Sequence, residues 1–336
     1  MKKHLIPLFV PILLLCGCSE STQKKSFFAM DTYITVSASG KNAADSLDKV
    51  CTQLTELEGI FSVTDESSDI SRINLSEGKS VEVSPETAEL IGISKDIYRI
   101  SGGKTDITVY PLVREWGFTT GEYKIPDKQT ISKLLKFTDC PEITVDGNTV
   151  SVPDGFMLDL GSVAKGYAGK KAAELLKSEG IESAILDLGG NIQTIGSKPD
   201  GSPWKVAVAD PNSPAETLCI VSVRDKAVVT SGNYQRYFIG DDGKNYCHII
   251  NPETGFPADS GLASATVIGD DGAYCDGLST ALFVMGEEKA AEFIRQNKDY
   301  EAILVTEDGR IIISGGIFPE TDFPDEETRS RAEVMK

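Results

Sequence analysis

The segment from residue 156 to 190 constrains the fold of this chain more than any other. A short apolar run at residues 157–160 ends at Gly161-Ser162. Apolar residues then recur at helical spacing as far as Gly180, and a second apolar run covers residues 184–188. The pattern predicts a strand, a tight turn, a helix and a second strand, around which the rest of the chain must be arranged.

Lys165 is unusual within this segment because it falls in the first turn of the predicted helix. The macrodipole and the unpaired N–H groups at a helix N-terminus favour an anion and disfavour a cation. A lysine at this position therefore indicates a phosphate nearby, or it is a solvated surface lysine that tolerates a small penalty. The segment alone leaves both interpretations open.

The glycines of this segment do not form a common nucleotide-binding fingerprint. Four residues separate Gly161 from Gly166, but Tyr167 follows where a P-loop requires lysine and then serine or threonine. Gly189-Gly190 also lacks the Rossmann pattern. A phosphate ligand must therefore be held in another way.

Length and charge limit the function classes. With 336 residues, 40% of them hydrophobic, the chain is long enough for a large core. Its net charge of −18 argues against a nucleic-acid partner and against attraction to anionic lipid headgroups. No linker divides residues 26–316, so we expect one α+β unit in which helices interrupt a mixed, largely antiparallel sheet.

The N-terminus has the pattern of a targeting segment. Lys2 and Lys3 precede an apolar stretch, residues 5–15, that is too short to span a bilayer as a mature helix. The following residues resemble a bacterial lipobox, which implies cleavage before Cys18 and lipid attachment to its sulfur. We therefore expect a signal peptide at residues 1–17, a lipidated tether at 18–25 and an extracytoplasmic lipoprotein, on the outer face of the cell membrane or in the periplasm, bound to the membrane through its lipid alone.

The rest of the chain supplies further elements. The pattern predicts one strand at residues 27–39, helices at 43–61, 84–101 and 274–285, and an acidic, loose tail at 317–336. Five cysteines remain after Cys18, and their scattered, odd-numbered spacing fits neither a disulfide framework nor a Cys-x-x-Cys metal site. We expect them to be buried thiols that behave as small hydrophobes.

His248 is the only histidine left once the signal peptide, which carries His4, is removed. It ends a predicted strand just before a turn at residues 251–255, a position from which a loop can present a functional group. A single histidine excludes His-rich zinc sites, and no Gly-x-Ser-x-Gly elbow accompanies it as in many hydrolases. A structural histidine remains the alternative.

Asp276 and Thr280 are four residues apart in a predicted helix, so their oxygens project from the same face. A carboxylate and a hydroxyl suit Mg²⁺, which usually shares phosphate oxygens with its substrate and keeps several waters. Alternatively, Asp276 serves only the helix terminus. The spacing alone does not decide between these functions.

Eight blocks, in order along the chain, resemble the ApbE family of bacterial FAD:protein FMN transferases. Such ordered spacing over residues 27–286 is much more specific than any single motif. The blocks are FAMDT (28–32), SDISRIN (68–74), DIT with PLV and WGF (106–118), LDLGSVAKGYA (158–168), DLGGN (187–191), TSGNY (230–234), HIINP with Thr254-Gly255 (248–255), and Asp276 through Thr280 to Ala281-Leu282.

The resemblance implies an ApbE-type, T-fold-like catalytic unit and a Mg²⁺-dependent transfer. FAD is split at its pyrophosphate, FMN passes to a threonine or serine hydroxyl of a target protein as a phosphoester, and AMP leaves. Asp276, Thr280 and a backbone carbonyl near Ala164 would hold the metal, and Lys165 would add positive charge. His248 would take the proton of the incoming hydroxyl, with a metal-bound carboxylate as the competing base.

The resemblance also implies a flavin pocket and a class of acceptors. Expected acceptors are subunits of Na⁺-translocating NADH:quinone reductase or of Rnf-type complexes. Two alternatives stay open: a metal-dependent FAD pyrophosphatase that yields FMN and AMP, and a flavin-binding lipoprotein without turnover. The candidate flavin-binding residues are Met30, Asp31, Thr32, Asp159, Lys165, Asp187, Gly190, His248 and Thr254.

Overall fold

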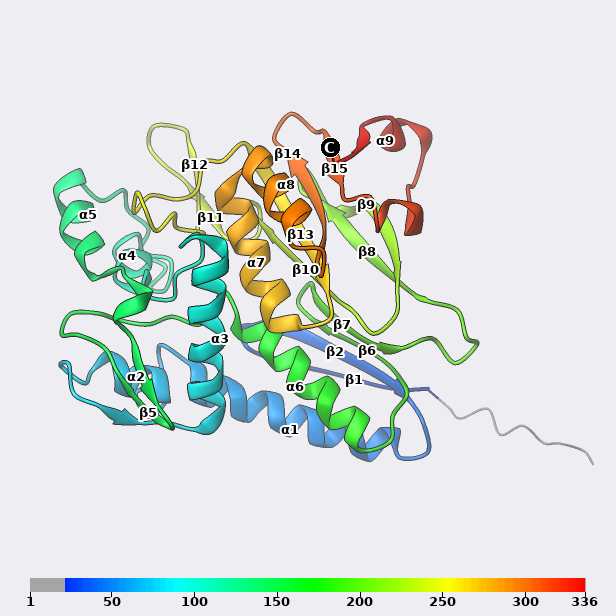
Figure 1. The fold of residues 1–336 in the computed structure, drawn as a ribbon, viewed down its shortest axis with the longest axis horizontal. Coiled ribbons are helices and arrows are strands. Elements are labelled where there is room, and N and C mark those ends of the chain that lie inside the picture. The colour runs from blue at the N-terminus through cyan, green and yellow to red at the C-terminus, as the bar shows by residue number, and fades with distance from the viewer. Residues whose placement is uncertain (1–21, 336) are drawn as a thin grey trace, which may run out of the picture.

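A nine-stranded sheet organises the computed structural model, which describes residues 22–335 (Figure 1). All neighbouring strands in it are antiparallel except the last pair, β15 and β17, which is parallel. The predicted α+β class with a mixed, largely antiparallel sheet is confirmed. In spatial order the strands are β1 (Thr22–Ala29), β2 (Thr32–Ser39), β6 (Ser183–Leu188), β7 (Asn191–Gly196), β10 (Ala227–Gly232), β13 (Leu262–Gly269), β14 (Glu301–Thr306), β15 (Ile311–Ile313) and β17 (Ala332–Val334).

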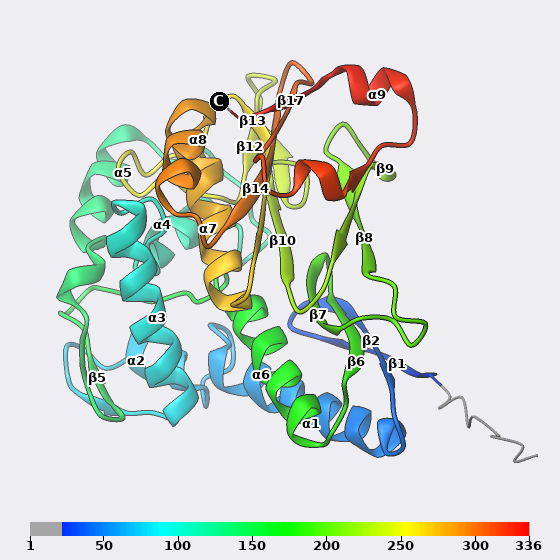
Figure 2. The same cartoon turned by 45° about the vertical axis from the view of Figure 1, so that its right-hand side comes forward.

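Helices and a small sheet cover this large sheet. The helices α1, α6 and α7 pack on one face, whereas β8 and β9 cover the opposite face of its C-terminal half (Figure 2). The helices are α1 (Ala43–Phe61), α2 (Asp69–Asn74), α3 (Pro85–Ser101), α4 (Tyr110–Glu115), α5 (Lys128–Leu134), α6 (Ala164–Ser178), α7 (Gly272–Met285), α8 (Glu287–Gln296) and α9 (Glu326–Ser330).

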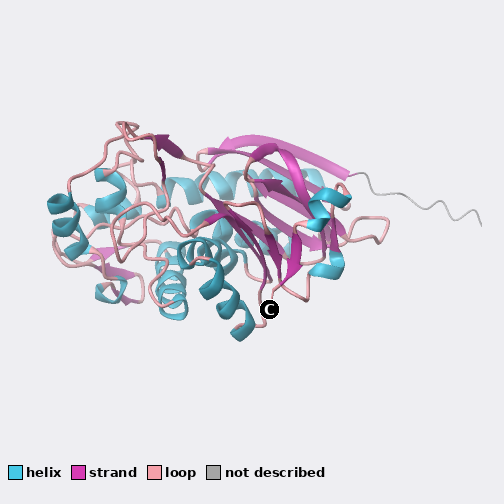
Figure 3. Ribbon diagram, turned by 90° about the horizontal axis from the view of Figure 1, so that it is seen from above, coloured by secondary structure: helices cyan, strands magenta, loops and turns pink. Residues whose placement is uncertain are grey.

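Three small sheets complete the fold. Two of them lie with α2, α4 and α5 in the part of the molecule beside the large sheet, where loops and short helices predominate (Figure 3). The strands are β3 (Val81–Glu82) with β5 (Thr149–Ser151) and β4 (Thr144–Asp146), β11 (Tyr237–Ile239) with β12 (Asn245–Cys247), and β16 (Thr321–Asp322) with β9 (Ser213–Val223) and β8 (Trp204–Asp210).

The two long N-terminal helices agree with their sequence signals. Apolar residues at helical spacing bury one face of α1, which has the predicted bounds. Ser84 caps α3 by accepting a hydrogen bond from the Thr87 N–H, and Gly102 ends this helix in the left-handed conformation.

The single strand predicted at residues 27–39 is wrong, because the chain folds there into the hairpin of β1 and β2. Met30 and Asp31 form its turn with φ angles of 53° and 57°. Two left-handed residues give a turn that matches the strand twist, but neither is the glycine or asparagine that usually marks such a turn. Residues 22–25 of the predicted tether belong to β1, and Cys18 lies outside the described residues.

The strand predicted at residues 157–160 is also absent. The backbone of Leu158 pairs with a side chain instead, because its N–H donates to Asn74 Oδ1 at 2.6 Å and its carbonyl accepts from Asn74 Nδ2 at 2.9 Å. The Asp159 N–H donates to the carbonyl of Ile107. Leu158 and Leu160 are therefore buried in a segment that belongs to no strand, and the backbone of Leu158 is satisfied by a side chain.

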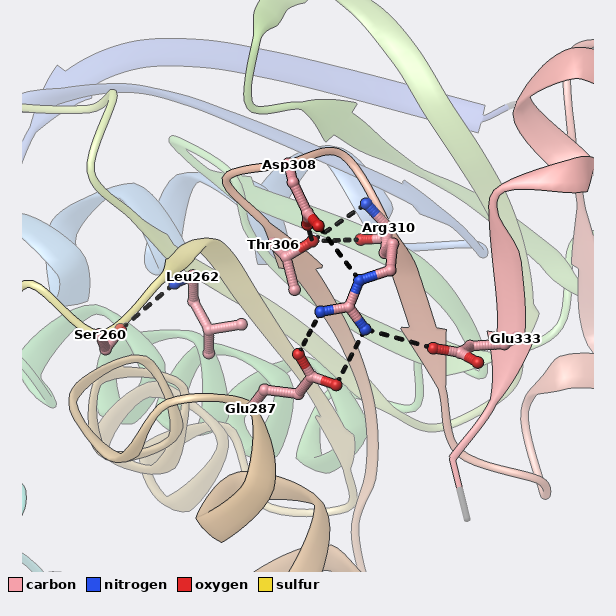
Figure 4. A network of polar contacts seen from close by, with 7 residues as sticks. All are labelled: Ser260, Leu262, Glu287, Thr306, Asp308, Arg310 and Glu333. Atoms are coloured by element: carbon pink, nitrogen blue, oxygen red, sulfur yellow. Dashed lines mark hydrogen bonds and ion pairs between the residues drawn. The ribbon is translucent and has the colours of Figure 1, made fainter.

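The C-terminal segment is folded onto the domain, so the loose tail predicted for residues 317–336 is wrong. β16 pairs with β9, and β17 forms the edge of the large sheet. Arg310 holds this edge, since its guanidinium bonds Glu287 of α8 at 2.6 and 3.0 Å and reaches Glu333 of β17 at 3.4 Å (Figure 4). Three paired strand residues and one branched ion-pair network therefore order a segment that is poor in apolar residues.

Replacement of Arg310 by alanine is expected to loosen β17 without unfolding the domain. The network is exposed, so its contribution is modest and falls as salt screens the charges. Hydrogen exchange followed by mass spectrometry should show faster exchange at residues 332–334, most clearly at low ionic strength. Arg99→Ala removes an exposed pair with Asp96 in α3 and serves as the control. Equal exchange in both variants would show that backbone pairing alone holds the edge.

Two further expectations concern cysteines and membrane spans. Within residues 22–335 all five cysteines are unpaired thiols, and four of them are buried, as expected; Cys51 is only half-buried. No helix of this part of the chain is both long and apolar enough to span a bilayer.

Candidate active site

The N-terminus of α6 and the first turns of α7 meet at a contact that only glycines permit. A Cβ atom on Gly166 would lie 2.0 Å from the carbonyl oxygen of Gly272, and one on Gly272 would lie 2.6 Å from that of Gly166. In both cases the added Cβ atom would clash with a backbone carbonyl, which cannot move aside as a flexible side chain can. The two helices therefore approach closely enough for a side chain of α7 to reach the N-terminal N–H groups of α6.

Asp276 is the side chain that does so. Its Oδ2 accepts a hydrogen bond of 2.8 Å from the Gly166 N–H, in the first turn of α6, whose own preceding residue, Val163, provides no side-chain cap. The carboxylate thus caps a second helix across the fold. Burial raises its pKa to about 6, although the charge of Lys165 and the Gly166 N–H oppose the shift. Asp276 is a buried acid next to a cation.

A row of polar groups from three elements surrounds this carboxylate. Thr280 Oγ1 lies 3.1 Å from Ser231 Oγ of β10, and Ser231 Oγ lies 2.8 Å from Ser279 Oγ. Asn191, at the start of β7, is close enough to lower the pKa of Asp276, but its Nδ2 reaches no hydrogen bond of normal geometry within the described residues. Asn191 therefore faces the carboxylate from β7 with a donor group.

Lys165 lies in the first turn of α6, as predicted. Its charge lowers the pKa values of Asp276, Asp159 and His248, so its field reaches all three groups. Within residues 22–335 its ammonium makes no hydrogen bond or ion pair. A half-buried cation at a helix N-terminus, with no protein anion bound directly to it, is compatible with a phosphate ligand and with a solvated lysine, so the phosphate stays a prediction.

His248 follows β12 and is oriented by the backbone of Arg236. The carbonyl of Arg236 accepts a hydrogen bond of 3.0 Å from the His248 N–H and lies 3.2 Å from its Nδ1. The Nδ1 nitrogen must carry the proton to donate to this carbonyl, so Nε2 keeps its lone pair. Burial, followed by the positive charge of Arg236, lowers the pKa of His248 to about 4. The ring is therefore neutral near pH 7 and can accept a proton.

Asp159 lies near both cations. Its Oδ1 accepts a hydrogen bond of 2.8 Å from the Gly161 N–H, which fixes the turn that leads into α6. Burial raises the pKa of Asp159, and this N–H together with the charges of Arg236 and Lys165 opposes the shift. Asp159 therefore joins the part of the site formed by His248, Arg236 and Lys165.

The β1–β2 turn reaches the same region. Asp31 forms an ion pair with Arg236, and the Met30 N–H donates to Glu58 Oε1 at 2.8 Å. Thr32 packs against the next hairpin turn, because a Cβ atom on Gly189 would lie 1.9 Å from Thr32 Oγ1. Gly189 therefore permits the two turns to lie against each other.

Two of the predicted flavin-binding residues have evident structural functions. Asp187 Oδ1 accepts a hydrogen bond of 2.8 Å from the Gly190 N–H, which closes the turn between β6 and β7. Thr254 Oγ1 accepts from the Phe256 N–H at 3.3 Å within its own loop. In the described part of the chain no hydrogen bond or ion pair joins Thr254 to the other candidates, so its place in a flavin pocket stays a prediction.

The donor set is compatible with Mg²⁺ shared with a substrate. Residues 22–335 contain no group of three His, Cys, Asp or Glu side chains that could hold a metal ion by themselves. One carboxylate, one hydroxyl and a backbone carbonyl leave most coordination positions to water and to substrate phosphates, which is the usual arrangement for Mg²⁺. The Asn191 amide nitrogen beside Asp276 is a hydrogen-bond donor, so it cannot bind the ion itself but can donate to a phosphate oxygen.

Comparison with known proteins identifies the family. The model of the ApbE family matches residues 30–304, which is most of the chain and includes every candidate named above except the lipidated cysteine. The chain belongs to the ApbE family. The predicted resemblance is thereby confirmed.

Relatives in the ApbE family agree in sequence and in fold. The chain is 34% identical over 262 residues to the FAD:protein FMN transferase of Klebsiella pneumoniae (strain 342), covering 76% of this chain and 81% of that protein. It is 31% identical to the FAD:protein FMN transferase of Vibrio cholerae (strain O395), covering 92% and 96%. The crystal structure of the ApbE protein of Thermotoga maritima superposes with a TM-score of 0.82 at 32% identity, covering 88% of this chain and 98% of that one.

Sequence reasoning missed three residues of this ApbE-family site. Asn191 and Ser231 fall within the matching blocks, so those blocks could have suggested them, but neither is charged. Arg236 falls outside the blocks, and its spacing from His248 gives no signal. Only the folded chain shows that its carbonyl and its guanidinium both face the site.

Proposed function

We propose that this chain is an FAD:protein FMN transferase, which moves FMN from FAD to a threonine or serine hydroxyl of another protein and releases AMP. The observation that carries the proposal is the meeting of three groups from distant segments. Asp276 of α7 is hydrogen-bonded to the first turn of α6, and the charge of Lys165 in that turn acts on both Asp276 and the neutral imidazole of His248. The names of the relatives given above support it.

The proposed reaction exchanges the phosphoanhydride bond of FAD for a phosphoester bond to the acceptor. The acceptor oxygen forms a bond to the phosphorus of the FMN half of FAD, and the bond from this phosphorus to the bridging oxygen breaks. AMP leaves with that oxygen, and the acceptor keeps FMN as a phosphoester. No oxidation or reduction is involved.

The residues of the site suit the demands of this exchange. Such transfers depend mainly on positioning and on neutralising phosphate charge. Lys165 and the N–H groups that begin α6 provide positive potential at one place. His248 can accept the proton of the acceptor hydroxyl at Nε2, because its Nδ1–H is held by the Arg236 carbonyl. Its low pKa keeps it in the accepting form at neutral pH.

Mg²⁺ is part of the proposal. Asp276, Thr280 and the backbone carbonyl near Ala164 would hold the ion, with the remaining positions left to water and phosphate oxygens. A bound Mg²⁺ would neutralise charge on the pyrophosphate and on the leaving AMP. The Asp276–Gly166 hydrogen bond engages Oδ2 and holds the carboxylate at the N-terminus of α6.

The place of action and the acceptors are also proposals. Lipid on Cys18 would hold the domain at the outer face of the cell membrane or in the periplasm. Suitable acceptors are membrane-associated redox subunits, such as those of Na⁺-translocating NADH:quinone reductase or Rnf-type complexes, since a tethered enzyme meets membrane proteins readily.

Incubation of the purified protein with FAD, Mg²⁺ and a candidate acceptor subunit tests the proposal. We expect the acceptor to gain the mass of FMN and AMP to appear in equal amount, by mass spectrometry and chromatography. An acceptor whose target hydroxyl is removed, by Thr→Val or Ser→Ala at the modified residue, is the control. Free FMN and AMP without adduct would indicate a pyrophosphatase, and intact FAD after long incubation would indicate a flavin-binding protein without turnover.

A further inference from the structure

The proposed chemistry uses the backbone carbonyl of Arg236 but assigns no function to its guanidinium. Arg236 lies between β10 and β11, and its backbone carbonyl touches His248 through both the main-chain N–H and Nδ1. The start of its side chain is therefore fixed at the edge of the imidazole. The guanidinium extends from there to Asp31 in the β1–β2 turn.

The ion pair between Arg236 and Asp31 is exposed, so another anion can replace Asp31 easily. The side chain of Arg236 is 52% exposed and that of Asp31 is 72% exposed. Exposed pairs contribute little to stability, because water and salt compete with them. A ligand with a stronger negative charge can therefore draw the guanidinium away from Asp31 at small cost.

Arg236 shares two electrostatic neighbours with Lys165. Both cations act on the same two groups, since each lowers the pKa values of Asp159 and of His248. The chain as a whole carries a net charge of −18, so a polyanionic ligand can be held only where a few cations converge. A guanidinium binds two phosphate oxygens at once, which a lysine ammonium cannot do.

We propose that Arg236 binds a phosphate group of the flavin nucleotide, and that Asp31 holds this guanidinium at the mouth of the site until the nucleotide arrives. This inference rests on the proposed function, because it takes a flavin nucleotide as the ligand. Arg236 then serves twice: its carbonyl orients His248, and its side chain fixes the phosphate next to that imidazole. Asp31 competes with the substrate for the same guanidinium.

The variants that test the inference change charge and little else. Arg236→Gln removes the charge of an exposed side chain and leaves the carbonyl in place, and Arg236→Lys keeps the charge. Asp31→Asn removes the competing charge and keeps a residue that tolerates the left-handed backbone of this turn, where φ is 57°. Binding of FAD, FMN and riboflavin is measured by flavin fluorescence or calorimetry without acceptor protein, with chromatography confirming that the flavin stays intact.

We expect Arg236→Gln to weaken binding of FAD and FMN by about tenfold or more, and to leave riboflavin, which has no phosphate, unchanged. Arg236→Lys should recover part of the loss. Asp31→Asn should tighten FAD binding a few-fold at low salt, roughly what an exposed ion pair is worth, and this gain should vanish in the Arg236→Gln background.

The outcomes separate this inference from the proposed function. Unchanged FAD binding in Arg236→Gln, or equal losses for FAD and riboflavin, would overturn the inference while flavin transfer by the wild type stands. Weaker FAD binding in Asp31→Asn would overturn the competition between Asp31 and the substrate. A wild-type protein that binds FAD in the expected charge-dependent way but labels no acceptor would contradict the proposed function alone, and one that binds no FAD would contradict both.

Discussion

Asp276→Asn is expected to abolish flavin transfer while leaving the protein folded. The substitution keeps an oxygen that can accept the Gly166 N–H bond of 2.8 Å, so the cap on α6 survives. It removes the only carboxylate that the proposed metal site has. Loss of one preorganised charge at a reacting phosphate lowers turnover by roughly 10²–10³-fold or more. Turnover with FAD, Mg²⁺ and an acceptor is the measurement.

The stability of the Asp276→Asn variant at pH 7 should not fall with its turnover and should equal or exceed that of the wild type. Burial raises the pKa of Asp276 to about 6, above its unfolded value, so its contribution to stability is complete only below the unfolded pKa and is lost as pH rises through 6. At pH 7 the ionised carboxylate therefore costs stability, and a neutral amide does not. Denaturant unfolding at pH 7 should show a midpoint equal to or higher than that of the wild type.

Asp271→Asn is the matched control, because Asp271 lies five residues earlier and serves only structure. It caps α7 by accepting from the Ala273 and Tyr274 N–H groups and pairs with Lys170 at 2.7 Å. We expect a loss of about 1 kcal/mol in the free energy of unfolding or less, with turnover nearly unchanged. Equal turnover in the two variants would refute the assignment of Asp276 to the metal.

Among glycine-to-alanine substitutions at this site, Gly166→Ala is expected to cause the largest loss of stability. The new methyl group would lie 2.0 Å from the Gly272 carbonyl oxygen and 2.6 Å from Asp276 Cβ, in space that backbone atoms fill. The helices α6 and α7 must separate to admit it. Overpacking of this kind costs about 3 kcal/mol or more when neither side can yield.

Turnover of Gly166→Ala should fall as well, because separation of the helices moves Asp276 away from the N-terminus of α6. Gly92→Ala provides the comparison: Gly92 is an exposed glycine in α3, and a Cβ atom there meets nothing within 4 Å. That variant should gain up to about 1 kcal/mol from better helix propensity and keep full activity. A Gly166→Ala protein with wild-type unfolding would show that the contact between α6 and α7 is looser than described.

Local signals explain which parts of the fold could be predicted. The bounds of α1 follow from apolar spacing, and those of α3 from Ser84 and Gly102, because both features act within one turn of the chain. The β1–β2 turn could not be predicted in this way, since Met30-Asp31 contains no glycine or asparagine although both residues adopt left-handed φ angles.

Long-range contacts explain what could not be predicted. The Asn74 side chain replaces a neighbouring strand for Leu158, across 84 positions of sequence. Asp276 caps a helix that begins 112 positions earlier. The expectation of a loose C-terminal segment used average composition, whereas Arg310 and three strand pairs decide its structure. Sequence motifs predicted which residues are candidates for chemistry. Their relative positions depend on long-range contacts, which the motifs do not contain.

The ends of the described chain form the two opposite edges of the large sheet. β1 is the first strand across it and β17 the last, with seven strands between them. At about 4.8 Å per strand, the two edges are roughly 38 Å apart along the sheet. A protein domain fused after β17 would therefore extend from the β17 edge of the sheet. It would leave the β1 edge free for attachment to a surface.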